Sequence, residues 1–244
     1  MSQMNSSSIV VLTGAGVSAE SGIETFRGPK GLWEGHSIDE VATPEAFLKN
    51  PKKVQTFYNE RRKKLLMGSV FPNKAHLALA KLEAKWPGTV LIVTQNVDNL
   101  HELAGSKNVL HIHGSLLEAR CTQTDKVYFP WKEAILKTTK CACCDLAGTL
   151  RPNIVWFGEM PFELPRIFEA IEQSSWFISI GTSGQVYPAA GFVEHARLHS
   201  KATTVELNLE PSMLSHLFAD KHYGPATETV PDYIEGLLLE STSM

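Results

Sequence analysis

Short runs of apolar residues alternate along the chain with longer stretches in which apolar residues recur at helical spacing. This alternation is typical of α/β proteins, in which a mainly parallel sheet carries helices on both faces. We predict strands at residues 8–12, 89–94, 109–111, 176–180 and 203–207. Each predicted strand ends in a polar or glycine-bearing segment, and ligands of open α/β sheets bind outside the carboxyl ends of the strands. The pattern therefore predicts a Rossmann-like sheet with a ligand site along this edge.

Two stretches interrupt the alternation. Residues 28–73 are charged and helical in pattern, and residues 117–152 carry all four cysteines but show little apolar periodicity. We expect a helical insert and a cysteine-bearing insert that together form a smaller lobe of a single domain, residues 1–244. Taken alone, the run of basic residues at 61–64 predicts a solvated helix face.

Composition narrows the class of protein. The chain has 244 residues, 43% of them hydrophobic and 20% charged, which is ordinary for a globular protein with a sizeable core. A formal net charge of −3 gives no electrostatic reason to expect binding to nucleic acid or to an anionic membrane. The sequence has no apolar run long enough to span a membrane, and MSQMNSSS resembles neither a secretion signal nor a transit peptide. We expect a cytoplasmic protein whose clustered cysteines favour metal over disulfides, and its oligomeric state does not follow from the sequence.

A glycine-rich turn follows the first predicted strand in VVLTGAGVSAESGIETFR. Gly14, Gly16 and Ala19 fit G-x-G-x-x-A, in which the first glycine permits a tight turn and the second lets a phosphate approach the backbone. Amides at the helix start would then face a pyrophosphate, although an ordinary tight turn fits the pattern equally well. A dehydrogenase would carry a second strand that ends in an acidic residue about 20 residues later. The segment RGPKGLWEGH has no such strand, which argues against hydride transfer.

Six blocks follow one another in a fixed order: TGAGVSAESGIETFR, TQNVDNLH, HIHG, RPNIVWFGE, GTS and NLEP. In this order they resemble the sirtuins, the NAD-dependent protein deacylases, and the similarity is greatest to short bacterial members of class III. The resemblance extends from about residue 10 to residue 230. It implies an enzyme that removes acyl groups from protein lysines, binds its protein substrates as extended peptides, and consumes NAD to give nicotinamide and O-acyl-ADP-ribose.

The resemblance implies NAD-binding positions throughout these blocks. Ala15, Ile23, Asn96 and Asp98 match the nicotinamide pocket, and the segment ending at Arg27 matches a loop that covers the nicotinamide ribose. The full set implied to bind NAD is Gly14, Ala15, Gly16, Ala19, Glu20, Ile23, Phe26, Arg27, Trp33, Gln95, Asn96, Val97, Asp98, Gly181, Thr182, Ser183, Asn208, Leu209, Glu210 and Ala226. For any single position, a polar loop residue that caps a strand end is the alternative.

His113 is the implied catalytic base. It follows a predicted strand and precedes Gly114, in the place of the family's catalytic histidine. In the implied reaction the acyl oxygen attacks C1′ of the nicotinamide ribose as nicotinamide leaves, and a base then activates a ribose hydroxyl. Imidazole suits this step because its ordinary pKa of about 6.5 lies near neutrality. Asn96 is the second implied catalytic residue, whereas we expect His111 to be structural and assign no role to His101.

The helix-forming stretch VQTFYNERRKKLL contains Tyr58 and Arg61. Residues at i and i+3 share a helix face, where a phenol and a guanidinium can jointly bind a carboxylate. Such a pair on a charged helix is usually solvated, but at this place it resembles the class III signature for succinyl-, malonyl- or glutaryl-lysine. Ala42 matches a position where many deacetylases carry a bulky aromatic residue, which implies a deeper pocket that still admits acetyl-lysine. The set implied to bind substrate is Ala42, Tyr58, Arg61, Val155, Phe157 and Glu159.

The family's structural zinc is held by two C-x-x-C pairs, and this chain departs from that pattern. In the first pair Thr124 replaces the mate of Cys121; in the second, CACC, Cys141 and Cys144 keep the spacing while Cys143 is additional. We predict one structural zinc ion bound by Cys121, Cys141 and Cys144. Cys143 or a water molecule could complete the site, and a loop without metal is the alternative.

Two other functions are weighed against deacylation. A mono-ADP-ribosyltransferase would pass the sugar to an arginine or to water, but Tyr58 and Arg61 specify an acyl group. An NAD-sensing module without catalysis would need no base, whereas His113 and Asn96 are intact. We therefore expect an NAD-dependent enzyme that removes succinyl, malonyl and acetyl groups.

Overall fold

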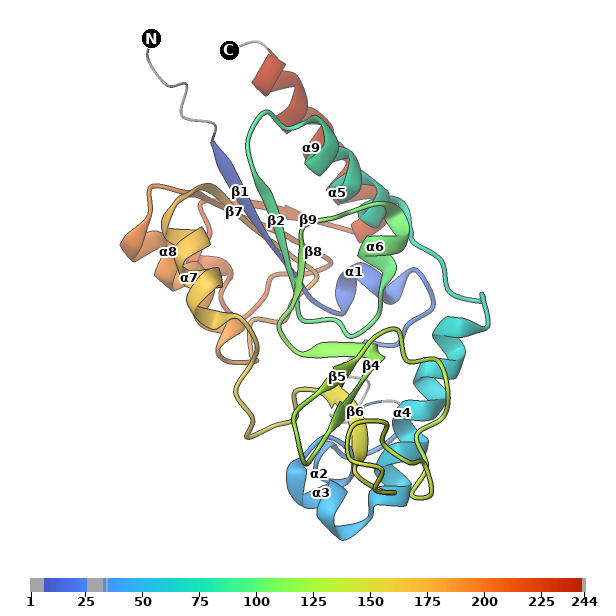
Figure 1. The fold of residues 1–244 in the computed structure, drawn as a ribbon. Coiled ribbons are helices and arrows are strands. Elements are labelled where there is room, and N and C mark those ends of the chain that lie inside the picture. The colour runs from blue at the N-terminus through green and yellow to red at the C-terminus, as the bar shows by residue number, and fades with distance from the viewer. Residues whose placement is uncertain (1–6, 26–32, 34, 243–244) are drawn as a thin grey trace.

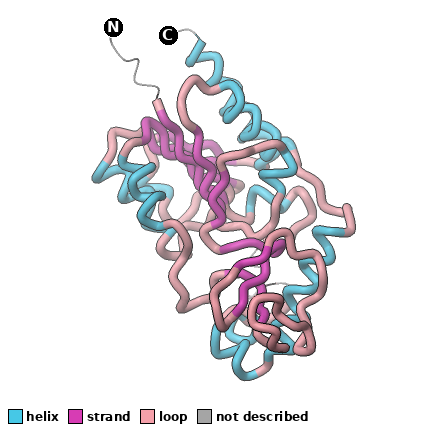
Figure 2. The backbone as a smooth tube through the Cα atoms, viewed as in Figure 1, coloured by secondary structure: helices cyan, strands magenta, loops and turns pink. Residues whose placement is uncertain are grey.

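Within the described part of the chain, the larger of two sheets has six parallel strands in the order β3-β2-β1-β7-β8-β9 (Figure 1) (Figure 2). The computed structural model describes residues 7–25, 33 and 35–242. The strands are β1 (Ser8–Thr13), β2 (Val90–Thr94), β3 (Val109–His111), β7 (Ser174–Ile180), β8 (Thr203–Asn208) and β9 (Asp220–Tyr223). The five predicted strands are confirmed to within about two residues at each end. β9 is an additional edge strand whose polar sequence, DKHY, has no apolar run to reveal it.

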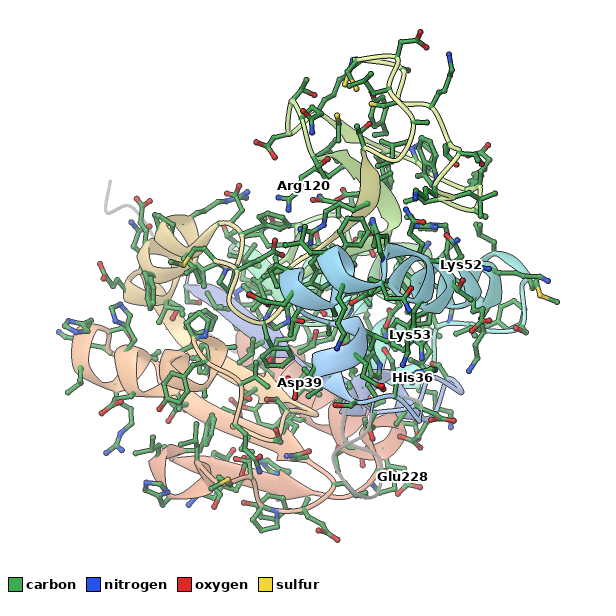
Figure 3. All side chains as sticks on the ribbon, turned by 90° about the horizontal axis from the view of Figure 1, so that it is seen from below. His36, Asp39, Lys52, Lys53, Arg120 and Glu228 are labelled. Carbon is green, nitrogen blue, oxygen red and sulfur yellow. The ribbon has the colours of Figure 1, made fainter. Side chains whose placement is uncertain are left out.

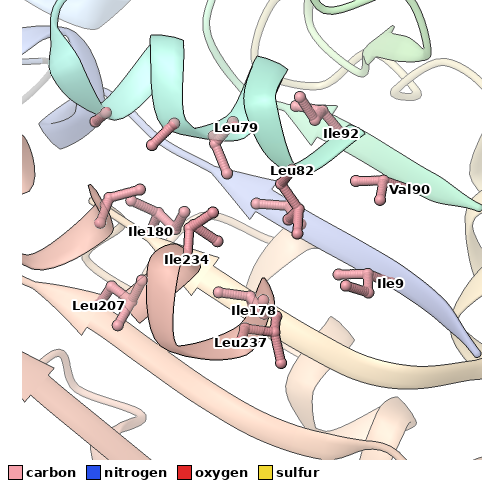
Figure 4. Packing of buried hydrophobic residues seen from close by; sticks show 14 of the residues in the cluster. Ile9, Leu79, Leu82, Val90, Ile92, Ile178, Ile180, Leu207, Ile234 and Leu237 are labelled. Atoms are coloured by element: carbon pink, nitrogen blue, oxygen red, sulfur yellow. The ribbon is translucent and has the colours of Figure 1, made fainter. Parts of the chain in front are cut away.

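Helices cover both faces of this sheet, as the alternation predicts. Side chains alternate along β1, so that Ile9 belongs to one buried cluster and Val10 to the other. The helices are α5 (Lys74–Lys85) and α9 (Ala226–Thr242) on the first face, shown in Figure 4, and α7 (Leu164–Glu172) and α8 (Phe192–His199) on the second. None of the helices in the described residues is long and apolar enough to cross a membrane. The layering confirms the predicted Rossmann-like α/β class.

The carboxyl ends of the parallel strands point toward a smaller lobe (Figure 1). The turn after β1 leads into α1 (Gly16–Ala19), and the segment after β2 leads into α6 (Leu100–Ala104). The segments after β3, β7 and β8 lie along the same edge, because all these strands are parallel. The polar blocks of the sequence therefore meet in one region of the molecule.

Among the residues that the structure describes, the smaller lobe contains an antiparallel sheet in the order β5-β4-β6, together with three helices. Its elements are β4 (Gly114–Cys121), β5 (Val127–Tyr128), β6 (Leu150–Ile154), α2 (Ile38–Val41), α3 (Pro44–Lys49) and α4 (Pro51–Leu66). The small sheet and its loops project from the rest of the molecule (Figure 3). The predicted insert boundaries at residues 117 and 152 fall within β4 and β6, and the division into inserts stays a prediction.

The basic run at 61–64 is not one solvated helix face, so that expectation is wrong. Arg61 and Arg62 are only 7% and 1% exposed, whereas the two lysines that follow face solvent. Arg62 Nε donates to the carbonyl oxygen of Leu116 at 2.6 Å and so joins α4 to β4. The run is divided between a buried and an exposed face because α4 packs against the small sheet, a contact that charge spacing alone does not reveal.

Candidate active site

A cavity of about 860 Å³ lies between the carboxyl edge of the large sheet and the small lobe. The predicted NAD-binding residues that line it are Gly14, Ala15, Gly16, Ala19, Glu20, Ile23, Trp33, Gln95, Asn96, Val97, Asp98, Gly181, Thr182, Ser183, Asn208, Leu209, Glu210 and Ala226. His113 and the predicted substrate residues Ala42, Tyr58, Val155, Phe157 and Glu159 also line it. Arg61 is not among the lining residues, and Phe26 and Arg27 lie outside the described residues. The structure thus brings most of the predicted residues together, and their individual roles stay predictions.

Backbone packing explains the glycine-rich turn. A Cβ on Gly14 would lie 2.8 Å from the carbonyl oxygen of Gly181, and a Cβ on Gly16 would lie 2.7 Å from the Gly181 Cα. Gly181 has a φ of +62°, which favours glycine. The amide of Gly16 donates to the carbonyl oxygen of Gly181 at 2.8 Å, and that of Val17 donates to Gly14 at 3.1 Å. The Gly16 amide holds the turn against the end of β7, and the Val17 amide closes the turn itself, so the expected contact of the helix start with a pyrophosphate does not use either of them.

Asn96 and Asp98 follow β2 and are held from behind by Ser18 on α1, a residue that sequence reasoning missed. Asn96 Nδ2 donates to Ser18 Oγ at 3.1 Å and to the carbonyl oxygen of Gly14 at 3.2 Å. The Ser18 hydroxyl donates to Asp98 Oδ2 at 3.1 Å, and Asp98 Oδ1 accepts from the amide of Leu100 at 3.0 Å. Burial raises the pKa of Asp98, and these hydrogen bonds oppose the rise. These contacts fix both side chains in the cavity wall.

Two buried histidines lie behind Ser18. His76 Nε2 is 3.4 Å from Ser18 Oγ, and His101 Nε2 is 3.0 Å from Thr13 Oγ1. Burial lowers the pKa of His76 to about 4 and that of His101 well below its ordinary value, so both rings are neutral near neutral pH. They extend the polar support of the cavity wall into the core without adding charge. The sequence carries one signal for the position of His76, which lies three residues after Asn73. That spacing is typical of a capping box, and the two residues form one at the start of α5.

His113 presents a defined tautomer to the cavity. Its Nδ1 lies 3.1 Å from the carbonyl oxygen of Gln95, which can only accept, so Nδ1 carries the proton and Nε2 keeps its lone pair. Burial lowers the pKa of His113, and the hydrogen bond offsets only part of that shift. Gly114 has a φ of +79°, and a Cβ there would collide with the carbonyl oxygen of Asn153, so the turn after the histidine requires glycine. A neutral imidazole beside a cavity suits general-base chemistry.

His111 bridges the ends of two strands and does not line the cavity. Its Nε2 lies 2.7 Å from Glu102 Oε1, and its Nδ1 lies 3.0 Å from the carbonyl oxygen of Asn96. Burial opposes protonation, but the hydrogen bond and charge of Glu102 outweigh it and raise the pKa of His111. The contact supports the backbone at Asn96, as expected for a structural residue.

The end of the cavity nearest α4 is aromatic. Tyr58 is 1% exposed, and its hydroxyl oxygen accepts a hydrogen bond from Trp156 Nε1 at 3.0 Å. Burial raises the pKa of Tyr58, so the hydroxyl stays protonated near neutral pH. An indole nitrogen can only donate, so this contact does not use the Tyr58 proton. The small side chain of Ala42 is part of the same wall and leaves the cavity open there.

Arg61 is folded back onto its own helix. Its Nη1 donates to the carbonyl oxygen of Phe57 at 2.7 Å. The guanidinium carbon lies 3.2 Å from the centroid of the Phe57 ring and 5.4 Å from that of Trp33, which does line the cavity. The positive charge therefore lies in an aromatic wall beside the cavity, next to Tyr58 but outside the lining.

Glu159 is held by arginines. Arg151 binds both of its carboxylate oxygens, at 2.6 and 2.9 Å, and Arg120, labelled in Figure 3, lies 3.6 Å away. Burial would raise the pKa of Glu159, but the Arg151 hydrogen bonds and charge lower it. Glu159 also accepts from the amide of Trp156 at 2.8 Å, and the Arg151 guanidinium carbon lies 3.3 Å from the Trp156 ring centroid. This ion pair fixes the segment that carries Phe157, and a contact of Glu159 with substrate stays a prediction.

The cavity also reaches the start of α9. Glu20 accepts from the amide and the hydroxyl of Thr227 at 3.0 and 2.6 Å, and so holds the first turn of that helix. Ala226, the first residue of α9, lines the cavity beside it. Asn208 Nδ2 donates to the carbonyl oxygen of Thr182 at 2.9 Å, which joins the ends of β8 and β7. These contacts join two pairs of segments around the cavity: the end of α1 with the start of α9, and the end of β7 with the end of β8.

The four cysteines gather at one end of the small sheet, where Cys121 ends β4 and the other three lie in the loop between β5 and β6. Their sulfur atoms all lie within 4.8 Å of one another, and all four cysteines are free thiols. Four thiolates bound to one zinc ion at about 2.3 Å would lie about 3.8 Å apart in a tetrahedral site. The cluster therefore fits such an ion, and it includes Cys143 beside the predicted ligands Cys121, Cys141 and Cys144.

Comparison with known proteins gives one family. The model of the Sir2 family matches residues 14–188. An NAD-dependent protein deacylase of Pasteurella multocida is 60% identical over 230 residues, which are 94% of this chain and 97% of that protein. An NAD-dependent protein deacylase of Salmonella typhimurium is 53% identical over 235 residues, which are 96% of this chain and 85% of that protein.

Solved structures share the arrangement of both lobes. A Sir2 homologue in complex with NAD has a TM-score of 0.85 at 39% identity, covering 96% of this chain and 90% of that one. A mutant Sir2 homologue with ADP ribose has a TM-score of 0.87 at 37% identity, covering 100% and 99%. A complex of Sir2 with a p53 peptide and NAD⁺ has a TM-score of 0.74 at 30% identity, covering 97% and 94%.

Proposed function

The chain belongs to the Sir2 family and is an NAD-dependent protein deacylase, and we propose that it prefers lysines whose acyl group ends in a carboxylate, such as succinyl and malonyl, while also accepting acetyl-lysine. The observation that carries this preference is the protonated Tyr58 hydroxyl in the cavity wall with the Arg61 charge beside it. An acetyl group has no carboxylate and needs neither side chain. The two residues therefore select among acyl groups.

NAD binds in this proposal along the carboxyl edge of the large sheet. The adenosine lies toward Ala226, the phosphates lie over the segment at Thr182, and the nicotinamide lies against Asn96 and Asp98. The supporting observation is that Asn96 and Asp98 already have fixed orientations, because Ser18 binds both. Donors and acceptors that are oriented in advance require no reorganisation when the ligand arrives.

His113 acts as the general base. After the acyl oxygen has displaced nicotinamide at C1′, a ribose hydroxyl must lose a proton to attack the acyl carbon, and Nε2 of His113 receives it. The resulting imidazolium keeps its Nδ1–H on the carbonyl oxygen of Gln95, which stabilises the positive charge. The lysine amine then leaves the acyl carbon, which stays bonded to two ribose oxygens, and one water molecule breaks the bond to the C1′ oxygen. Acyl-lysine, NAD and water thus give free lysine, nicotinamide and O-acyl-ADP-ribose.

A carboxylate that enters the aromatic end of the cavity leaves water and must be paired there. Tyr58 donates a hydrogen bond through its hydroxyl proton. The Arg61 guanidinium, which must turn from the Phe57 ring toward the cavity, supplies the opposite charge. A hydrogen bond to a charged group contributes roughly 1.5–3 kcal/mol. Trp156 supports this arrangement because its indole N–H occupies one lone pair of the Tyr58 oxygen and leaves the proton for the ligand.

The substrate peptide lies extended between residues 155–159 and 184–186. The Arg151–Glu159 ion pair holds the first of these segments in place. Recognition of an extended peptide through its backbone tolerates many side chains, so we expect loose sequence selectivity. The substrates would be cytoplasmic proteins, since a cytoplasmic location is our prediction from the sequence.

One structural zinc ion is part of the proposal, with Cys121, Cys141 and Cys144 among its ligands. The proximity of all four sulfur atoms supports it. In the described residues, Cys121 and Cys141 are buried in a small apolar cluster. Thiolate–zinc bonds would therefore stabilise loops that a hydrophobic core holds only weakly.

Mass spectrometry of two matched peptides, one with succinyl-lysine and one with acetyl-lysine, tests the function. With NAD, we expect both peptides to be deacylated, with a higher kcat/KM for the succinyl peptide and formation of O-acyl-ADP-ribose. Without NAD, neither peptide should react. Deacetylation without desuccinylation would contradict the acyl preference alone, whereas ADP-ribose attached to protein in place of deacylation would contradict the proposed reaction.

A further inference from the structure

The four cysteines of the cluster do not form two C-x-x-C pairs, because Thr124 stands where the first pair would have its second cysteine. We propose that Cys143 is the fourth zinc ligand of this protein and takes the coordination position that a cysteine at position 124 would otherwise occupy. The inference rests on the structural zinc proposed above. One ligand, Cys121, then comes from the last residue of β4, and three come from the CACC segment. The backbone of the two loops, the sulfur positions and the hydrogen bonds to the sulfurs each support this ligand set.

The two cysteine loops have the same backbone geometry. In the first, the amide of Cys121 donates to the carbonyl oxygen of Lys126 at 3.0 Å, and the amide of Asp125 donates to the carbonyl oxygen of Cys121 at 2.9 Å. In the second, the amide of Cys141 donates to the carbonyl oxygen of Leu146 at 3.0 Å, and the amide of Asp145 donates to the carbonyl oxygen of Cys141 at 2.8 Å. The fourth residue after each cysteine, Asp125 or Asp145, has a positive φ, 55° and 54°. The first loop therefore keeps the shape of its partner although its second cysteine is missing.

The Cys143 sulfur lies where that missing cysteine would reach. It is 3.0 Å from Thr124 Oγ1 and 3.2 Å from the sulfur of Cys141. The sulfurs of Cys121 and Cys144 are 3.9 Å apart. These sulfur–sulfur distances bracket the separation of about 3.8 Å expected for thiolates on one zinc ion. Thr124 itself is a poor ligand, because zinc in proteins takes thiolate, imidazole or carboxylate and rarely a neutral hydroxyl.

Thr124 has a different role in this arrangement, as a hydrogen-bond donor to the Cys143 thiolate. Its oxygen accepts from the amide of Lys126 at 3.4 Å, which leaves its proton for the sulfur. The Tyr128 hydroxyl oxygen lies 3.3 Å from the sulfur of Cys141, and the amide of Gln123 donates to the sulfur of Cys121 at 3.4 Å. A zinc ion with four thiolates has a net charge of −2, and such donors around the ligands reduce that excess.

Four full-length proteins, purified without chelator, test the proposal: wild type, Cys143→Ala, the double variant Thr124→Cys with Cys143→Ala, and Thr124→Val. Elemental analysis gives the zinc content, competition with a chromophoric chelator gives the affinity, and X-ray absorption counts the sulfur neighbours of zinc. We expect one zinc with four sulfurs in the wild type. Cys143→Ala should lose one sulfur neighbour and at least about 100-fold in affinity, the upper end of the effect of losing an outer partner.

The double variant should regain four sulfurs and most of the affinity, because it restores two C-x-x-C pairs on loops of matching shape. Thr124→Val should keep four sulfurs and lose about 10–100-fold in affinity, because only the donor to Cys143 is removed. Cys143→Ala with unchanged affinity, or wild type with three sulfurs and one oxygen, would overturn the proposal. If Cys143→Ala does not fold, the wild-type sulfur count decides by itself. A wild type that binds no zinc would overturn the structural zinc as well, whereas a three-sulfur zinc site would overturn only the role of Cys143.

Discussion

The two ends of the cavity are built differently. At the edge of the large sheet, Asn96 and Asp98 are fixed by Ser18, with neutral histidines behind it. At the α4 end, Tyr58 is set in an aromatic wall with the Arg61 charge beside it. In the proposed function, the sheet end faces the part of the reaction that every acyl group shares, and the α4 end faces only the acyl group. Substitutions at the sheet end should therefore affect all substrates, and those at the α4 end should change the ratio between them.

The largest effect is expected from His113→Ala. Removing the base should lower the rate of deacylation by about 10²–10⁴-fold for succinyl- and acetyl-peptides alike, because the proton transfer does not depend on the acyl chain. NAD binding, measured by calorimetry, should remain within a few-fold of wild type, since the ring is only one part of the cavity lining. A variant that removes either acyl group at the wild-type rate would refute the assignment of the base.

Arg61→Met should have the next largest effect, and only on one substrate. Loss of a charge-assisted contact of roughly 1.5–3 kcal/mol predicts a decrease of about 10–100-fold in kcat/KM for the succinyl-peptide. The acetyl-peptide should be deacylated at a nearly unchanged rate.

Arg61→Lys is the matched control, because it keeps the charge but loses the planar guanidinium. Its kcat/KM for the succinyl-peptide should lie between the values of the wild type and of Arg61→Met. The melting temperature of each variant separates a loss of selectivity from a loss of stability, since Arg61 also donates to the carbonyl oxygen of Phe57. Equal losses on both substrates in a stably folded Arg61→Met would show that the residue does not select for a carboxylate.

Trp156→Phe tests the same end of the cavity more finely. The change removes the N–H that orients the Tyr58 hydroxyl and keeps an aromatic ring in the wall. A neutral hydrogen bond contributes about 0.5–1.5 kcal/mol, so we expect a loss of about 2–10-fold in kcat/KM for the succinyl-peptide. Tyr58→Phe is the matched partner: if Trp156 acts through the hydroxyl, the double variant should lose no more than Tyr58→Phe alone. Additive losses would mean that Trp156 acts in some other way.

The two ends of the cavity also differ in how far the sequence predicts them. The strands of the large sheet are apolar runs, and the polar blocks that follow them meet at one edge because the strands are parallel. The supporting contacts were not predicted, because their partners are distant: Ser18 and Asp98 are 80 residues apart, and Tyr58 and Trp156 are 98 residues apart. Spacing also does not show which way a side chain turns. Arg61 was assigned to the acyl pocket by its place in Y-x-x-R, but its guanidinium stacks on Phe57 outside the cavity lining.

The smallest expected effect is a displaced pH profile. Burial lowers the pKa of His113, and only the neutral ring can accept a proton, so kcat/KM should fall on the acid side with a midpoint below the ordinary histidine value of about 6.5. Asp98, whose pKa burial raises, could produce a similar acid limb. Measurements at two temperatures distinguish them, because the ionisation of imidazole depends strongly on temperature and that of a carboxyl group hardly at all. A midpoint above about 6.5 would contradict the lowered pKa, and a temperature-independent midpoint would assign the limb to Asp98 at the sheet end of the cavity.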